Sequence, residues 1–573
     1  MLETANLRLL TRAPQKCERH HVGSGLQPCR RASARRAERK LGGAPEGPAP
    51  RGFQWSGGSA AILLALTATL LAADTLGPAP LVSAIKSGQR SVAIDMIAHK
   101  SADVNAAEAD GSTPLLWAAS QNDTDLVARL LKAGADPKAR NLLGSAPLAE
   151  AALHANTEMI RALLDAGADP NAAGPDGQTP LMVIARTSDV DAAKLLLAKK
   201  ANPNVVEALR GQTALMWAAA AGQGLMVRAL LAGGADVDTK SATDLMTPLV
   251  SGEPRAQPRP PGGMTAMLFS AREGCLDCVK ALVERGAKVD LPDPEGVTPL
   301  ISAIFNAHFD VAKFLIESGA NVDRWDWWGR SPLYLAVDYN TLPHGGRPDQ
   351  PSLDETLPID IIRMLLDRGA NPNLQLKLLP PYRATGADRG VDRMLSFGAT
   401  PLLRAAKAMD APAIKLLLDH GAIIDLPNNE GMTPTLVASG MGSIDADTRG
   451  YFMTSDVEDR AIASLELLLA HGGALNQGAG RLQQVPLHGA AFWGWNKVVE
   501  YLLAKGADIN LADNRGFTAL DYAMGRAGGN SRGGQRIDIH KETGDLLISK
   551  GGKPGTPIPQ ANAPRGGPGG RTQ

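Results

Sequence analysis

The sequence predicts an all-α-dominated repeat fold, an α-solenoid built from about 12 copies of one small unit. The main observation is a block of similar sequence that returns with a period of about 33 residues. Composition agrees with this fold class, because 44% of the 573 residues are apolar, 61 are Gly and only 4% are aromatic. Such values exclude a wholly disordered chain and favour a core of small aliphatic side chains with frequent turns. Four cysteines are too few for a disulfide-dense scaffold.

The repeated block reads as two helices and a turn. Residues 110–119 are Asp-Gly-Ser-Thr-Pro-Leu-Leu-Trp-Ala-Ala, in which Thr caps a helix that Pro begins. Apolar residues at 126, 127, 130 and 131 predict one face of a second helix, which Gly134 ends. An Asp three residues before the Gly, as in Asp326 to Gly329, fits a tight hairpin between units. The opening returns at 144–148, 177–181, 211–215, 263–267, 296–300, 329–333, 398–402, 431–434, 486–491 and 516–520.

These residues resemble the ankyrin repeat. The resemblance implies that residues 80–550 form a helix, a turn, a helix and a β-hairpin finger per unit, stacked into a solenoid. It also implies that His488 holds a position from which the ring bonds neighbouring backbone. Trp117 and Trp217 are expected to pack in the core, because they precede the Ala-Ala pair of their helices.

Five insertions interrupt the pattern, all after the fifth copy. They lie near 240–262, 341–357, 378–397, 441–459 and 526–540. The first and third fall between units and should lengthen fingers, whereas the other three fall between the two helices of a unit. Long loops in an otherwise regular repeat are either functional or merely tolerated on the surface.

Two features predict a partner-binding surface. Trp325, Trp327 and Trp328 crowd a finger tip where this repeat usually has polar residues. Three indoles at an exposed turn favour a binding patch; alternatively they fold back on the neighbouring inserted loop or cap the next hairpin.

The second feature is the inserted loop at 378–397. It offers Tyr382, Arg383, Arg389 and Arg393 beside two prolines. Tyr and Arg are enriched among the residues that dominate binding energy at interfaces.

The sequence predicts no enzyme, no cofactor and no metal site. Asp and Glu recur at repeat positions, so no pair stands out as an acid and base. Cys275 and Cys278 have the spacing of a redox pair at the start of a second helix. They form a possible disulfide, or remain structural thiols; without a second Cys pair zinc is disfavoured.

The ends of the chain differ from its body. Lys and Arg equal Asp and Glu overall, but residues 1–58 carry +7, the tail from 551 carries +3, and residues 74–550 carry −10. Residues 1–58 are expected to be a disordered basic leader, or sequence upstream of the true start, and 551–573 a disordered Gly/Pro-rich tail. Residues 59–73 form an apolar stretch of signal-peptide length. Alternatives are an uncleaved membrane anchor or a buried helix.

The sequence therefore predicts an exported, periplasmic or secreted, non-catalytic protein that binds an unknown protein partner through its concave finger and helix face. No nucleic acid is expected at the repeat body, and membrane contact is expected only if 60–73 is uncleaved. One alternative is a membrane-tethered scaffold. Another is an enzyme whose site is built by inserted loops, which should gather carboxylate or His side chains of shifted pKa near the insertions.

Overall fold

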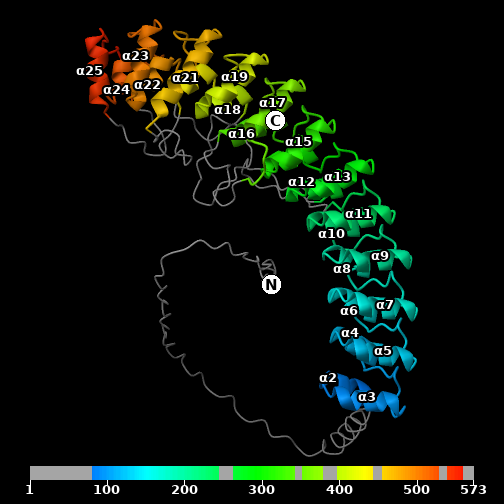
Figure 1. Cartoon of the computed structure of the whole chain (residues 1–573). Coiled ribbons are helices and arrows are strands. Elements are labelled where there is room, and N and C mark those ends of the chain that lie inside the picture. The colour runs from blue at the N-terminus through cyan, green and yellow to red at the C-terminus, as the bar shows by residue number, and fades with distance from the viewer. Residues whose placement is uncertain are drawn as a thin grey trace, which may run out of the picture. The chain divides into compact units, whose positions relative to one another are not determined.

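Twelve helix pairs make up the structure, a computed structural model that describes residues 80–243, 262–341, 352–377, 397–442, 455–527 and 539–558 (Figure 1). The chain divides into a unit before residue 76 and a unit from Leu76 onward, and every described residue belongs to the second. The expected leader and the apolar stretch at 59–73 lie outside the described residues.

Each pair has a first and a second helix. The first helices are α2 (Pro80–Lys86), α4 (Pro114–Ser120), α6 (Pro147–Leu153), α8 (Pro180–Ala185), α10 (Ala214–Ala220), α12 (Ala266–Glu273), α14 (Pro299–Phe305), α16 (Pro332–Asn340), α18 (Pro401–Ala408), α20 (Pro434–Ala438), α22 (Pro486–Trp493) and α24 (Ala519–Ala523). The second helices are α3 (Arg90–Ala98), α5 (Thr124–Lys132), α7 (Thr157–Asp165), α9 (Val190–Ala198), α11 (Gly224–Ala232), α13 (Leu276–Glu284), α15 (Phe309–Glu317), α17 (Pro358–Asp367), α19 (Ala411–Asp419), α21 (Val457–Ala470), α23 (Asn496–Ala504) and α25 (Lys541–Ser549).

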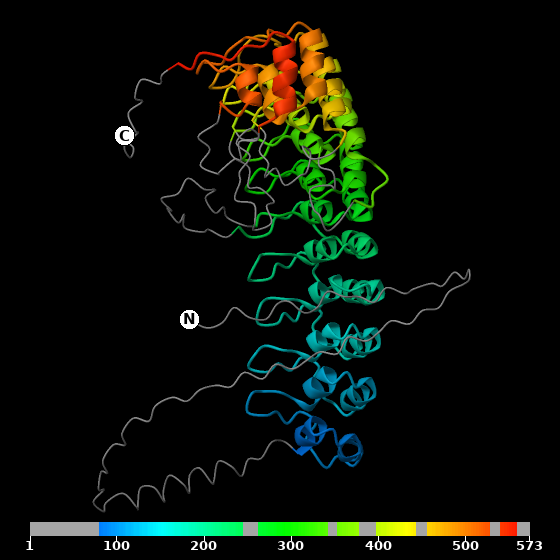
Figure 2. The same cartoon turned by 90° about the vertical axis from the view of Figure 1, so that its left-hand side faces the viewer.

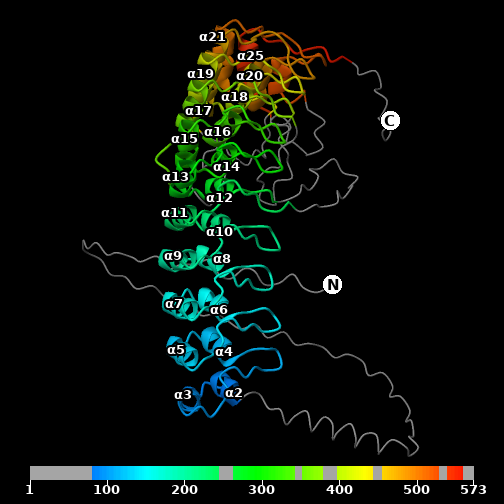
Figure 3. The same ribbon diagram turned by 90° about the vertical axis from the view of Figure 1, so that its right-hand side faces the viewer.

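The helices stack in two rows. Each first helix packs on the first helix of the next unit, and the second helices form a parallel row behind them. The fingers project from the side of the first helices (Figures 2 and 3). This arrangement confirms the predicted α-solenoid and its number of units.

The first helices begin where the sequence pattern predicts. Thr113 Oγ1 accepts the Leu116 N–H at 3.2 Å, and Pro114 follows as the first helical residue. Thr179, Thr298 and Thr400 cap their helices in the same way. A capping oxygen and a residue without an N–H together satisfy donors that a helix end otherwise leaves unpaired.

The core consists of small aliphatic side chains, as the composition predicts. Ala118 and Ala119 of α4 are fully buried, as are Ala218 and Ala219 of α10. Side chains of this size let the backbones of neighbouring first helices approach closely. The two large residues beside them, Trp117 and Trp217, are half-buried and pack against this core.

The fingers are hairpins without extended strands. Within the described ranges the only β-bridges are isolated, at Thr243 with Gly262 and at Ala479 with Gln484. Many consecutive finger tips meet through a single backbone bond, such as the one that the Leu142 N–H donates to the Asp110 carbonyl at 2.7 Å. Within a finger the arms also meet through few bonds, such as the one that the Glu108 N–H donates to the Ser112 carbonyl at 3.0 Å, so the described fingers contain no regular strand.

A second set of bonds joins successive fingers. In each, an Asn or Asp side-chain oxygen accepts a backbone N–H of the following unit over 2.7–3.0 Å. The acceptors in the described residues are Asn105, Asn171, Asn204, Asp238, Asp290, Asp323, Asn373, Asp425, Asn476 and Asn510. Between the second and third units this position holds Lys138, which has no acceptor oxygen.

Replacing Lys138 with Asn is expected to supply the missing bond, to the Asp169 N–H, and to raise the free energy of unfolding by about 0.5–1 kcal/mol. The gain is modest because water already reaches the exposed fingers. Asn204→Lys is the matched control, since it creates the interruption that Lys138 causes, and it should lower stability by a similar amount. Urea denaturation measures both variants, and changes of the same sign in the two would contradict this account.

The five expected insertions lie mostly outside the described residues, but their flanks are described. At each of the two insertions between units, a backbone hydrogen bond joins the residues on either side of the inserted loop, which we call its neck. The Ser241 N–H donates to the Met264 carbonyl at 2.9 Å, and the Leu376 N–H donates to the Ala399 carbonyl at 3.0 Å. The other three gaps, at 342–351, 443–454 and 528–538, separate the two helices of a unit.

The last unit is completed by residues that we expected in a disordered tail. The Lys553 N–H donates to Asn510 Oδ1 at 2.8 Å, and the Ile558 N–H donates to the Arg515 carbonyl at 2.9 Å. Residues 551–558 therefore form an outer finger, and the expectation of disorder does not hold for them. Residues 559–573 lie outside the described ranges.

Candidate interaction surface

The finger between α14 and α16 is held by a buried carboxylate. Asp326 is fully buried, and its Oδ1 accepts the backbone N–H of Trp328 at 3.0 Å and that of Arg330 at 2.9 Å. Its Oδ2 pairs with Arg330 Nε at 2.7 Å. Gly329 completes the turn at φ +83°, and a Cβ there would lie 2.6 Å from the Lys377 backbone nitrogen. This turn is therefore fixed from both sides.

Two of the three indoles on this turn face solvent. Trp325 is 46% exposed and Trp327 is 52% exposed. Lys377 Nζ lies 3.1 Å from the centroid of the Trp325 ring, in cation–π contact. The pair presents a large apolar area at the end of a rigid turn.

The prediction of three exposed indoles is wrong for Trp328. This side chain is only 7% exposed, and the Arg330 guanidinium lies 4.8 Å from its ring centroid. The reason is the turn itself, because the bonds to Asp326 direct Trp328 inward against Arg330 while the preceding indole points outward.

The neck of the inserted loop at 378–396 lies beside this turn. The Lys377 backbone N–H donates to the Trp328 carbonyl at 2.9 Å, one residue before the loop begins. The structure therefore brings the start of the loop to the exposed indoles. The candidate residues Tyr382, Arg383, Arg389 and Arg393 lie outside the described residues.

The structure adds a row of exposed apolar residues that the sequence reasoning missed. The first residue of each finger turn is apolar and exposed from the first finger to the turn of Trp327. Its members are Ala109, Leu142, Pro175, Ala208, Ala242, Pro294 and Trp327. Leu142 is the most prominent aliphatic member, at 82% exposed. The spacing of 33 residues from 109 to 208 could have revealed this row, which extends the candidate surface along the fingers.

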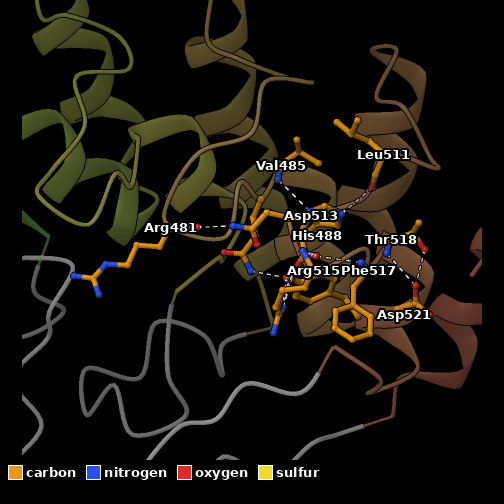
Figure 4. Close-up of polar contacts among 12 residues, drawn as sticks. Arg481, Val485, His488, Leu511, Asp513, Arg515, Phe517, Thr518 and Asp521 are labelled. Carbon is orange, nitrogen blue, oxygen red and sulfur yellow. Dashed lines mark hydrogen bonds and ion pairs between the residues drawn. The ribbon is translucent and has the colours of Figure 1, made fainter. Parts of the chain in front are cut away.

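The last two units contain a buried polar cluster around His488 (Figure 4). Its Nδ1 accepts the Val485 N–H at 3.1 Å and its Nε2 donates to the Leu511 carbonyl at 3.0 Å, which requires a neutral ring. Burial lowers the pKa of His488 to about 4. This is the backbone-bonding role that the resemblance implied, and it satisfies the N–H of Val485, the residue before α22 that has no capping side chain.

Beside His488, the Tyr522 hydroxyl donates to Asp513 Oδ2 at 2.8 Å, and Arg515 Nη2 reaches the same oxygen at 2.9 Å. Burial works to raise the pKa of Asp513, but the hydrogen bonds from the Phe517 N–H, Tyr522 and Arg515 outweigh it and lower that pKa. Burial raises the pKa of Tyr522 above its ordinary value. Gln484 Nε2 donates to the Tyr522 hydroxyl at 2.6 Å, so the cluster joins the unit of α22 to the unit of α24.

Carboxylates of raised pKa were the expected sign of an enzymatic site. Burial raises the pKa of Glu150, Asp293, Asp326 and Asp410, which lie in different units. Asp293 and Asp326 bind the N–H groups of finger turns, and Asp410 caps α19. Three of the four thus have a structural role. The described residues hold no group of three or more His, Cys, Asp or Glu side chains placed to bind a metal ion.

The two candidate cysteines are joined. Cys275 and Cys278 form a disulfide at the start of α13, with Cys278 fully buried and Cys275 half-buried. As for the membrane, no helix in the described ranges has both the length and the apolar character to cross a bilayer.

A comparison with known protein families identifies the repeat. A model described as ankyrin repeats in three copies matches residues 58–141, 81–174, 148–241, 242–326 and 267–376. These overlapping matches cover more than half of the chain. The chain belongs to the ankyrin-repeat family. Further ankyrin models match residues 397–429 and 487–531.

Individual relatives match shorter stretches of the chain. The chain is 30% identical over 165 residues to the transient receptor potential cation channel subfamily A member 1 of Drosophila melanogaster, covering 28% of this chain and 13% of the channel. It is 29% identical over 126 residues to the homolog of that channel in Caenorhabditis elegans, covering 22% and 9%. This chain thus spans about a tenth of the length of these relatives.

A solved ankyrin-repeat structure also matches. It is the crystal structure of the ankyrin repeat domain of Bcl-3, a unique member of the IkappaB protein family, at 24% identity and a TM-score of 0.33, covering 39% of this chain and 94% of that chain. Ankyrin repeats generally mediate interactions between proteins, and proteins built from them are typically non-catalytic scaffolds.

Proposed function

We propose that this chain is an exported, non-catalytic binding protein that takes a protein partner on the finger and first-helix face. The observation that carries this proposal is the pair of exposed indoles, Trp325 and Trp327, on a turn that the buried Asp326 fixes. Trp is among the residues that most often dominate binding energy at protein interfaces. A rigid turn loses little conformational freedom when a partner binds, so more of the contact energy appears as affinity.

The rest of the face supports an extended contact. The apolar row that begins at Ala109 and ends at Trp327 runs along consecutive fingers, and the bonds between fingers keep its members in place. Residues 74–550 carry a charge of −10. The partner is therefore expected to bring basic patches around an apolar contact, because opposite charge speeds association and orients it.

Replacing Trp325 and Trp327 together with Ala is expected to weaken partner binding at least about 30-fold, equivalent to about 2 kcal/mol. Trp328 is left intact because it is buried in the fold. The partner is first isolated by in-cell crosslinking to the wild-type chain, and its dissociation constant is then measured by calorimetry. Leu225→Ala, which removes an exposed side chain from the second-helix row, is the matched control and should bind as the wild type does. Equal affinity of the Trp double variant would refute this assignment.

Export is supported by the apolar stretch at 59–73, which has the length of a signal-peptide core. The disulfide between Cys275 and Cys278 fits an oxidising compartment. We expect the protein purified from an exported fraction of its native cells to begin near Asp74. Terminal sequencing by cell fraction tests this, and an intact leader in the membrane fraction would instead favour the tethered scaffold.

A further inference from the structure

The Cys275–Cys278 pair has features that the proposed binding function does not use. It sits at the start of α13 (Leu276–Glu284), where Cys275 is the residue that caps the helix. Cys275 is half-buried, whereas Cys278 is fully buried and belongs to the core. Cys275 is therefore the more accessible residue of the pair, and Cys278 is shielded from solvent.

The position of Cys275 is one that other units give to an anion. Asp123, Asp189 and Asp410 occupy it in their units, and each carboxylate accepts the N–H three residues later at 2.9–3.1 Å. Cys275 Sγ accepts the Cys278 N–H at 3.2 Å in the same way. A helix N-terminus favours negative charge, so the position of Cys275 suits a thiolate, the reactive form of cysteine.

The backbone before the pair is also fixed. Gly274 has φ +76°, and a Cβ there would lie 2.4 Å from His308 Nδ1. His308 Nε2 in turn donates to the Arg272 carbonyl at 3.0 Å. The turn that carries Cys275 is thus packed against the next unit by contacts that do not involve the disulfide.

A purely structural role explains the pair poorly. The bond encloses only two residues, within a helical turn, and a loop this short stabilises a fold least. The other units build the same helix pair with no disulfide, since the remaining cysteines, Cys17 and Cys29, precede them. Ala192 and Ala413 fill the position of Cys278 in their units and are fully buried.

We propose that Cys275 and Cys278 form a thiol–disulfide exchange site whose co-reactant is a dithiol. A thiolate of the dithiol attacks Cys275 Sγ, the bond to Cys278 breaks, and Cys278 leaves as a thiolate that takes up a proton. The second thiol of the co-reactant then attacks the mixed disulfide at its own first sulfur and releases Cys275. The co-reactant becomes a disulfide, and its two electrons reside on the reduced cysteine pair.

The test uses the full chain carrying Cys17→Ser and Cys29→Ser, so that only the pair remains. The folded protein is exposed to dithiothreitol or to a reduced thioredoxin, probes for a small dithiol and a protein dithiol. Mass spectrometry is expected to show that at least one of them reduces the disulfide without denaturant. The faster probe indicates whether the co-reactant is a small dithiol or a protein dithiol. After reduction, iodoacetamide is expected to label Cys275 at least about tenfold faster than Cys278.

Two variants take their residues from other units and so preserve the fold. Cys278→Ala leaves Cys275 alone, and it should form a mixed disulfide with oxidised glutathione. Cys275→Asp keeps the helix cap but leaves only the buried sulfur, and it should form at least about tenfold less mixed disulfide with glutathione. A pair that is reduced or labelled only in urea, or equal reaction of the two variants, would overturn the proposal.

Discussion

Replacing Asp326 with Ala is expected to lower the free energy of unfolding by about 3–5 kcal/mol, the usual cost of removing one partner of a buried ion pair. The loss is large because Arg330, only 6% exposed, would keep its charge without the carboxylate that it meets at 2.7 Å. The N–H groups of Trp328 and Arg330 would lose their acceptor as well. The same change should weaken partner binding, since it releases the turn that positions Trp325 and Trp327.

Urea denaturation of the two proteins measures the loss, and hydrogen exchange of the seventh and eighth units shows where it falls. Asp176→Ala is the matched control, because Asp176 lies exposed at the tip of another finger. It should change stability by no more than about 0.5 kcal/mol. If the free energy of unfolding fell by similar amounts in the two variants, the buried ion pair of Asp326 and Arg330 would not be a major source of stability.

Acidification is expected to destabilise the last two units through His488. Its pKa is about 4 in the folded chain against an ordinary value near 6.5, because burial disfavours the charged ring. A lowered folded pKa means that the unfolded chain binds the proton more tightly. The stabilisation that the neutral ring provides is therefore fully present above about pH 6.5 and is lost as the pH falls toward 4. At pH 4 the free energy of unfolding is expected to be lower by about 3 kcal/mol. A protonated ring also ceases to accept the Val485 N–H.

The test compares urea unfolding at pH 7 and pH 4 in the wild type and in His488→Gln. Other carboxylates titrate in the same range, so the informative quantity is the difference between the two proteins. The wild type should lose about 3 kcal/mol more than the variant over this interval. His99→Gln, at an exposed helix end, serves as the control and should follow the wild type. An identical pH dependence of wild type and His488→Gln would rule this mechanism out.

The helices were predictable because their signals are local. The Thr-Pro start of α14 places a capping oxygen and a residue without an N–H side by side, and these act within one turn. The row of exposed apolar residues that begins at Ala109 could have been predicted in the same way, because its members recur every 33 residues from 109 to 208. The role of His488 came from the family pattern and agrees with its contacts.

The candidate surface was only partly predictable. Trp327 and Trp328 are adjacent in sequence, yet one is 52% exposed and the other 7%. Their difference depends on Asp326, whose oxygens bind the turn and Arg330 at once. No periodic pattern distinguishes two neighbouring indoles on a turn of four residues.

The sequence by itself determined the repeat, the number of its units, the ends of most helices and the places where insertions interrupt it, because each depends on contacts within about 33 residues. Only the tertiary structure decided which indoles are exposed, that residues 551–558 complete the last unit, and that Cys275 stands where other units place a carboxylate. The bonds that orient the indoles and the cap at Cys275 are short in sequence, but the burial that separates Trp327 from Trp328 and Cys275 from Cys278 arises only when the units stack. The finger at 551–558 depends on a bond to Asn510, which lies far along the chain.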